Sequence, residues 1–220
     1  MGSFTRTAWH IFPGFLELFL LVCGYSVQNA IVVITPLLGS CVLLDCLRDR
    51  LPFVTRWFEA NGLKDCERTG MTGTTFYVIA VYTNLITATL WPSTQRLWFL
   101  GLWFLALGDP AAGFVGRRWG RHKVAGTGGK TIEGFCACFA CCFVLALAFL
   151  LNPQVGPQLP LETTGTRQIV AIALCGATVA ALTELMCPGG GVWDNLLIAF
   201  AGSLSMAVRF NGWETLGSFL

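Results

Sequence analysis

Charged residues are scarce in this sequence. Only 12% of its 220 residues are Asp, Glu, Lys or Arg, about half the share found in an ordinary globular domain. Hydrophobic residues make up 55% of the chain, and the mean hydropathy is +0.66. This composition excludes a soluble enzyme, a disulfide-stapled secreted module, a coiled coil and a disordered tail. It does not exclude an enzyme that works within a membrane.

The alternation of polar and apolar residues that builds a membrane barrel is also missing. Continuous apolar runs are present instead, and a helix that crosses a bilayer needs about 20 mostly apolar residues. The runs lie at residues 11–27, 30–44, 74–90, 97–107, 132–151, 168–186 and 193–208. They predict an all-α transmembrane helix bundle of seven spans in one catalytic domain, residues 1–220. Six spans is the alternative, if the short run 97–107 does not cross.

Basic residues concentrate in a few segments. Eleven of the 14 Lys and Arg residues fall at the N-terminus or in the connections 45–73 and 108–131. Because basic residues gather at the cytoplasmic ends of membrane spans, we predict a cytoplasmic N-terminus and cytoplasmic connections. We expect the protein to lie in the endoplasmic reticulum membrane if its source is a eukaryote, and in the inner or plasma membrane if its source is a prokaryote.

Most of the ten cysteines lie in or beside the apolar runs. Thiols in such places act as small apolar side chains. Cys138, Cys141 and Cys142 have helical spacing, which would also suit a soft metal, but no histidine lies near them. We interpret the cysteines as packing residues.

The connection 108–131 contains the most informative pattern. Asp109-Pro110 is typical of a helix start, with Asp109 as the N-cap and the proline at the first helical position. It predicts a short cytoplasmic helix, 109–121, in which Ala112, Gly116 and Gly120 share one face. Small residues with this spacing allow another backbone or a ligand to approach closely.

Cations and glycines follow this predicted helix. Arg117, Lys123 and Lys130 supply positive charge, and 125–129 is a glycine-rich turn whose N–H groups suit an anion. Thr131 and Glu133 open the next span. Together with Asp109, these groups suit a metal–nucleoside triphosphate, because the acid binds Mg²⁺ and the cations neutralise phosphate oxygens.

Simpler interpretations of the same residues remain open. Asp109 alone would serve as a helix cap, and the basic cluster alone would serve to orient the protein in the membrane. A P-loop is excluded, because Val124 stands where the first glycine of that motif would be.

Further ionisable residues lie in or near the apolar runs. These are His10, Glu17, Glu184 and Asp194, with Asn195 beside the last. A carboxylate within a membrane span is a candidate functional group, because an ionised side chain is costly in hydrocarbon.

With these residues in view, the chain resembles the membrane-embedded, CTP-dependent lipid kinases, which include dolichol kinase, phytol kinase and CTP-dependent diacylglycerol kinase. Residues 107–120 are similar to the family's Gly-Asp-x-x-Ala-x-x-x-Gly-x-x-x-Gly motif, and residues 130–134 to its Lys-(Ser/Thr)-x-(Glu/Ala)-Gly. The weaker matches, which mean little alone, are Arg6 with His10, Arg48, Glu67-Arg68-x-Gly70, and Glu184 with Asp194-Asn195-Leu196. Thr7 departs from the family's pattern, which has lysine there.

The resemblance implies transfer of the γ-phosphoryl group of CTP to a membrane lipid alcohol such as a polyprenol, dolichol, phytol or diacylglycerol. Asp109 would bind Mg²⁺, with Asp194 as a second ligand. Glu133 would orient Lys130 or the metal, and Glu67, Glu184 or His10 would take the hydroxyl proton. The residues expected to bind the nucleotide are Gly116, Arg117, Gly120, Lys123, Lys130, Thr131 and Glu133, with Arg48 and Asn195 in support. The partners are the lipid, the nucleotide and the bilayer, with no nucleic acid.

Three alternatives stand beside this function. Phosphatidate cytidylyltransferases share a stretch similar to Gly120–Lys123 and 130–135, but their Lys-Arg and Lys-Asp pairs and a later histidine are absent here. A small transporter would use Glu17 and Glu184 as intramembrane polar sites. A lipid-binding scaffold would account for the basic cluster but not for Asp109, Glu133 or Glu184.

Overall fold

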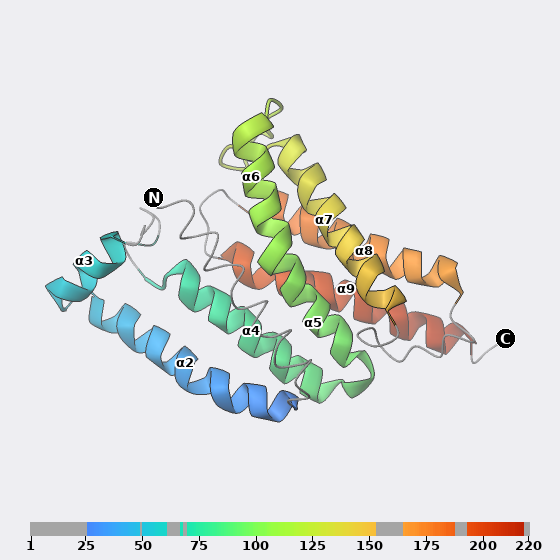
Figure 1. Ribbon diagram of the computed structural model, residues 1–220, viewed down its shortest axis with the longest axis horizontal. Coiled ribbons are helices and arrows are strands. Elements are labelled where there is room, and N and C mark those ends of the chain that lie inside the picture. The colour runs from blue at the N-terminus through green and yellow to red at the C-terminus, as the bar shows by residue number, and fades with distance from the viewer. Residues whose placement is uncertain are drawn as a thin grey trace.

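The computed structural model describes residues 26–48, 50–60, 67, 70–152, 165–187 and 193–217, and the regular structure in these ranges is helical (Figure 1). The helices are α2 (Val27–Arg48), α3 (Pro52–Ala60), α4 (Gly73–Leu90), α5 (Gln95–Trp103), α6 (Asp109–Trp119), α7 (Ile132–Leu151), α8 (Thr166–Met186) and α9 (Trp193–Gly217). A short 3₁₀ turn, η2 (Pro92–Thr94), precedes α5. The first predicted span, with His10 and Glu17, lies outside the described residues except at its last two positions.

Four described helices are long and apolar enough to cross a membrane: α2, the helix Pro92–Trp119, α7 and α8. The all-helical membrane class is therefore confirmed, and the count of seven spans stays a prediction. The predicted runs 74–90 and 193–208 correspond to α4 and α9, and α9 continues to Gly217.

The predicted fourth span is wrong in its extent. A π-helical turn, η3 (Phe104–Gly108), joins α5 to α6, so that one helix runs from Gln95 to Trp119. Asp109 has helical backbone angles, and Gly108 before it does too. Asp109 is thus an interior helical residue, and the predicted N-cap is wrong. Pro110 explains the turn, because it has no N–H for the usual α-helical bond, and a wider turn accommodates its ring.

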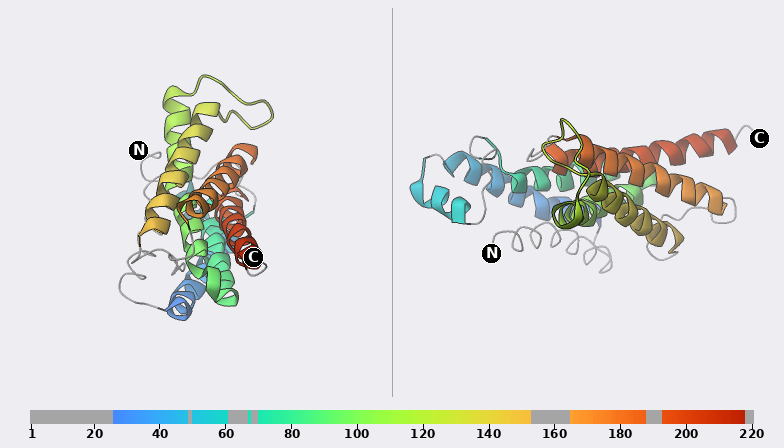
Figure 2. Two further views of the ribbon diagram at one scale, coloured as in Figure 1. Left: turned by 90° about the vertical axis from the view of Figure 1, so that its right-hand side faces the viewer. Right: turned by 90° about the horizontal axis from the view of Figure 1, so that it is seen from above.

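The helices pack around this long helix. Helix α7 lies beside α6 and returns antiparallel to it, α8 packs between α7 and α9, and α9 contacts α4 and α5 (Figures 1 and 2). Helix α2 packs on α4 at the edge of the bundle and turns large apolar side chains outward, with Val32 70% exposed. Bulky side chains from α5, η3 and α9 fill the centre, including Trp98, Phe104 and Ile198.

A polar contact lies in the middle of this apolar core. The Ser203 hydroxyl of α9 bonds to Asn84 Oδ1 of α4 at 3.1 Å and to the Trp98 carbonyl of α5 at 3.3 Å. Asn84 and Ser203 are fully buried, so each satisfies the other where water is excluded. Gly101 permits the contact, since a Cβ there would lie 1.8 Å from Ser203 Oγ.

The buried cysteines show packing of the kind the sequence predicts. Cys138 and Cys142 are fully buried on α7, with their sulfurs 4.0 Å apart. They face Gly108, where a Cβ would come within 2.6 Å of Cys142 Sγ. The thiols thus fill the narrow space between α7 and the π-helical turn.

We expect Gly101→Ala to destabilise the protein strongly. The added methyl group would collide with Ser203 and with the Ala199 carbonyl, and overpacking of this kind costs about 1–3 kcal/mol or more. Gly39→Ala is the matched control, because nothing lies within 4 Å of its added Cβ on α2. Thermal unfolding of both variants in one detergent measures the difference, and equal transitions would contradict the packing described here.

Candidate active site

The loop between α6 and α7 places Lys130 at the start of α7. Lys123 and Thr131 form an antiparallel bridge, and Val124 N–H donates to the Lys130 carbonyl at 2.9 Å. The turn between them needs left-handed backbone at Gly126, Gly128 and Gly129, which glycine adopts without strain. Thr131 then caps α7 by accepting a bond from Gly134 N–H at 3.1 Å. These bonds hold the backbone of Lys130 in place.

The Lys130 side chain reaches the end of α8. Its Nζ lies 3.0 Å from Glu184 Oε1 and also donates to the Glu184 backbone carbonyl. Both side chains are largely buried, with 15% of Lys130 and 9% of Glu184 exposed. A pair this well shielded interacts much more strongly than an exposed one.

Two further carboxylates lie near this pair. Asp109 of α6 and Asp194 of α9 are both close enough to Glu184 to interact electrostatically with its carboxyl group. The pKa of the nearby Cys187 thiol is raised, mainly by its burial, and the positive charge of Lys130 offsets part of this rise. Glu184 is therefore the acidic partner of Lys130, and Asp109 and Asp194 act on Glu184 from two other helices.

The carboxylates of Asp109 and Asp194 are of the kind that a divalent cation prefers. Mg²⁺ prefers carboxylate oxygens and is commonly held by one or two of them together with substrate phosphates. In the part of the chain that the structure describes, no three His, Cys, Asp or Glu side chains converge as a ready-made metal site. The half-buried Asp109 and Asp194 nevertheless offer the right kind of donor atom, so these residues fit a cation brought by a nucleotide.

The small-residue face of α6 packs against α7. A Cβ on Gly116 would come within 3.1 Å of Thr131 Oγ1, and one on Gly120 within 2.7 Å of the same atom. A Cβ on Gly134 would lie 3.0 Å from the Ala112 carbonyl. The sequence predicts that this face allows close approach of another backbone or of a ligand. In the structure it is the backbone of α7 that approaches it.

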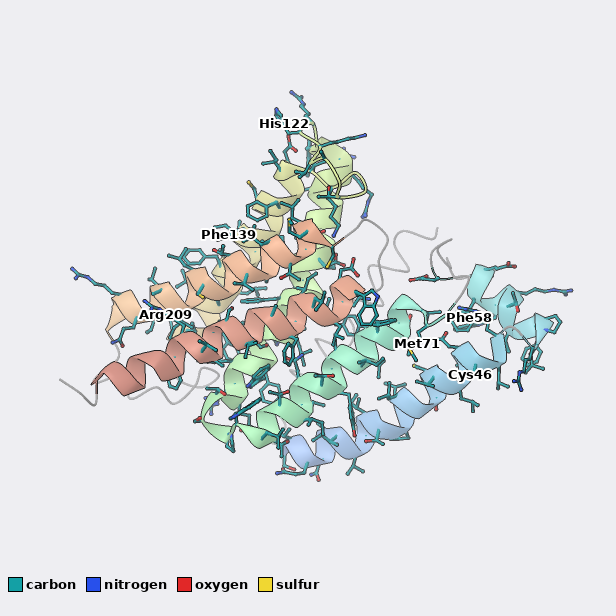
Figure 3. All side chains as sticks on the ribbon, turned by 180° about the vertical axis from the view of Figure 1, so that it is seen from behind. Cys46, Phe58, Met71, His122, Phe139 and Arg209 are labelled. Carbon is teal, nitrogen blue, oxygen red and sulfur yellow. The ribbon has the colours of Figure 1, made fainter. Side chains whose placement is uncertain are left out.

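Glu133 has a different partner from the predicted one. Its carboxylate lies 2.7 Å from His122 Nδ1 and accepts from His122 N–H at 3.3 Å. His122 lies at the tip of the α6–α7 loop in Figure 3. Among the described residues, Glu133 therefore stabilises the α6–α7 loop through His122. Glu184 is the carboxylate that contacts Lys130 and orients it. Arg117 and Lys123 lie nearby with exposed side chains.

A second polar cluster lies where α2, α4 and α9 meet. Glu67 Oε1 accepts from Gly73 N–H at 3.0 Å, and Asn195 Nδ2 donates to the Gly73 carbonyl at 2.9 Å. Glu67 and Asn195 are both buried. The structure thus brings together two predicted site residues that are separated by more than a hundred positions.

Asp45 anchors the other side of this cluster. Its Oδ2 accepts from Thr72 N–H at 2.9 Å and from the Thr75 hydroxyl at 2.5 Å. Arg48, one turn further along α2, donates to the Gly70 carbonyl at 2.8 Å. Two carboxylates, Asp45 and Glu67, therefore satisfy backbone N–H groups at the start of α4, where a helix favours negative charge.

The first turn of α9 joins the two clusters. Asp194 acts electrostatically on Glu184, while the next residue, Asn195, bonds to Gly73 on α4. Neighbouring helical residues point in directions about 100° apart, so adjacent positions serve two different clusters. His10 lies outside the described residues.

Sequence reasoning missed several residues of this site. Asp45 and Thr72 lay in the connection 45–73, which was treated as a loop, and Thr75 lay in the apolar run 74–90. An acidic residue directly after an apolar run was a usable signal for Asp45. The partnership of His122 with Glu133 had no local signal, because eleven positions separate the two residues.

An all-helical chain with apolar spans, and with a buried lysine among carboxylates at one end, is the arrangement expected of a membrane-embedded enzyme for an anionic ligand. The chain is 26% identical over 199 residues to CTP-dependent diacylglycerol kinase 1 of Schizosaccharomyces pombe. The matched region covers 88% of this chain and 87% of the relative. This similarity supports the family that the motifs indicate, the CTP-dependent lipid kinases. No protein-family model and no solved structure matches the chain.

We expect Asn195→Ala to lower the free energy of unfolding by about 1–3 kcal/mol, because the buried Gly73 carbonyl would lose its donor. Ser205→Ala is the control on the same helix, since Ser205 bonds only to the Gly202 carbonyl one turn back. Unfolding of both variants in the same detergent checks this. Equal stability of the two variants would remove Asn195 as the link between α4 and α9.

Proposed function

We propose that this protein transfers the γ-phosphoryl group of CTP to the hydroxyl of a membrane lipid alcohol, with diacylglycerol as the first acceptor to test. The observation that carries the proposal is the largely buried Lys130 before α7, paired with Glu184, on which Asp109 and Asp194 also act electrostatically. The similarity to a CTP-dependent diacylglycerol kinase supports both the donor and the acceptor.

Phosphoryl transfer asks a protein mainly for positioning and for neutralisation of charge. Lys130 has three N–H donors, of which its contacts with Glu184 use only part, so it is suited to bind a phosphate oxygen as well. The exposed Arg117 and Lys123 extend the positive surface along the same loop. Gly116, Gly120 and Thr131 support the nucleotide site by letting α6 and α7 approach closely.

Asp109 and Asp194 are the residues proposed to hold Mg²⁺. When bound, the ion would neutralise phosphate charge while the γ-phosphoryl group passes from CTP to the acceptor and CDP is released. Glu184 keeps Lys130 aligned through their ion pair. The acceptor hydroxyl loses its proton to a carboxylate, for which Glu67 is the best-placed described candidate. One Glu67 oxygen accepts from Gly73 N–H, and the carbonyl of the same glycine accepts from Asn195, the residue after Asp194. His10 remains the other candidate.

We further propose that the site faces the cytoplasm, because most basic residues lie in the two connections that surround it. Lys130 belongs to one of these connections and Glu67 to the other. The lipid hydroxyl would then meet CTP at the bilayer surface rather than in the hydrocarbon.

One assay tests the function directly. The purified protein is incubated in mixed micelles with CTP labelled either at the γ- or at the α-phosphate, together with diacylglycerol, dolichol or phytol. A kinase moves only the γ-label into these lipid alcohols. In a parallel reaction with added phosphatidate, cytidylyl transfer would instead move the α-label into lipid and release pyrophosphate. Parallel reactions with γ-labelled ATP define the donor. No labelled lipid under any condition would refute the proposal.

The Asp109→Asn variant tests the proposed metal ligand. The interior position of Asp109 means that it is not a helix cap, so the amide should leave folding intact. A hard divalent cation favours a carboxylate over an amide, and we expect phosphotransfer to fall by a factor of about 100 or more. Activity is measured across a Mg²⁺ titration, in which excess Mg²⁺ restores part of the loss. Normal turnover at low Mg²⁺ would remove Asp109 from the metal site.

Lys130→Ala and Glu184→Gln together test the buried pair. Loss of a charge-assisted phosphate contact worth about 1.5–3 kcal/mol should lower kcat/KM for CTP by about one to two decades in Lys130→Ala. If Glu184 acts through Lys130, the double variant should be hardly worse than Lys130→Ala alone. Additive losses would show instead that Glu184 has a role independent of the lysine.

A further inference from the structure

Helix α3 carries apolar side chains on two faces. Val54 is buried against the protein, whereas Phe53 is 70% exposed and Trp57 is 53% exposed. Phe53 and Trp57 are four residues apart and therefore lie on the same side of the helix. A nine-residue helix thus turns a phenylalanine and a tryptophan away from the protein to which its other face is attached.

Several contacts fix this orientation. Thr55 Oγ1 donates to the Arg48 carbonyl at 2.6 Å, and the Arg48 guanidinium lies 5.7 Å from the centre of the Phe58 ring. Arg48 itself is buried and bonds to Gly70. Figure 3 shows Phe58 on α3 near Cys46 of α2 and Met71, where these segments meet. The inner face of α3 is therefore occupied, and the outward direction of Phe53 and Trp57 follows.

The short connection between α2 and α3 determines what surrounds the face of α3 that carries Phe53 and Trp57. Helix α2 is long and apolar enough to cross a membrane and ends at Arg48, and α3 begins only four positions later, at Pro52. A chain advances at most about 3.3–3.6 Å per residue. If α2 crosses the bilayer, α3 is confined to the region of the lipid headgroups. Tryptophan is enriched at this level in membrane proteins, because its ring has both apolar and polar parts.

The charges around the exposed face suit the same environment. Arg56 is exposed beside Trp57, and Arg50 is exposed just before the helix. Glu59 is also exposed but follows Trp57 by two residues, which places it on nearly the opposite side of the helix. Basic residues flanking an apolar helix face attract anionic lipid headgroups.

We propose that α3 is an interfacial helix that docks on the bilayer crossed by α2, with Phe53 and Trp57 inserted among the lipids and Arg50 and Arg56 at anionic headgroups. The helix lies on the same side of the protein as the candidate active site, because Asp45 in the last turn of α2 bonds to Thr72 and Gly73 bonds to Asn195. This docking surface is separate from the residues proposed for catalysis.

Photo-crosslinking of the full chain in lipid nanodiscs tests the proposal. The photoreactive residue p-benzoylphenylalanine replaces Phe53, Trp57 or, as the exposed control on the other side, Glu59. The discs contain phosphatidylcholine with phosphatidylserine, and mass spectrometry identifies the adducts. We expect several-fold more lipid adduct at positions 53 and 57 than at 59. Equal adduct formation at all three positions, or adducts to a second protein chain at 53 and 57, would overturn the proposal.

The charge contribution has its own test. Phosphatidylserine should be over-represented among the lipids crosslinked at position 57, relative to its share of the disc. Arg56→Gln should remove this enrichment, and Arg118→Gln, an exposed arginine on α6, should leave it unchanged. Enrichment that survives Arg56→Gln and the additional loss of Arg50 would contradict recognition of anionic headgroups by α3.

Discussion

The ion pair between Lys130 and Glu184 is the interaction on which the arrangement of this site depends. Removing a charged side chain from water is costly, and a partner offsets that cost only when the geometry is close. Here the two charges lie 3.0 Å apart, and the lysine also bonds to the Glu184 backbone. The pair ties the α6–α7 loop to the end of α8. Loss of one partner would leave the other charge buried, so the loop and the helix end are held in register by electrostatics.

Close packing of α6 against α7 makes this pair possible. Gly116 and Gly120 on α6 face Thr131 and Gly134 on α7 with no room for side chains. Thr131 also caps α7, which fixes the direction in which Lys130 leaves the loop. The π-helical turn before Pro110 extends the same long helix, and it is this extension that brings Asp109 into the neighbourhood of Glu184.

The start of α9 links the charged site to the polar cluster at α2 and α4. Asp194 belongs to the first group and Asn195 to the second. A displacement of α9 along its axis would therefore disturb both clusters at once. The buried contact of Ser203 with Asn84 and the Trp98 carbonyl resists such a displacement further along the same helix.

The sequence by itself determined the helical membrane class, the positions of the described helices that match apolar runs apart from the fourth, and the motif residues by which the chain resembles the lipid kinases. Those properties follow from local composition and from short spacings, which can be recognised without knowledge of the fold. Only the tertiary structure decided that Lys130 pairs with Glu184, 54 positions away, and that Glu133 pairs with His122 instead. It also decided that Asp109 lies inside a continuous helix. The physical reason is that partners of buried charges depend on how helices are rotated and packed against one another, and that rotation results from contacts along the whole bundle.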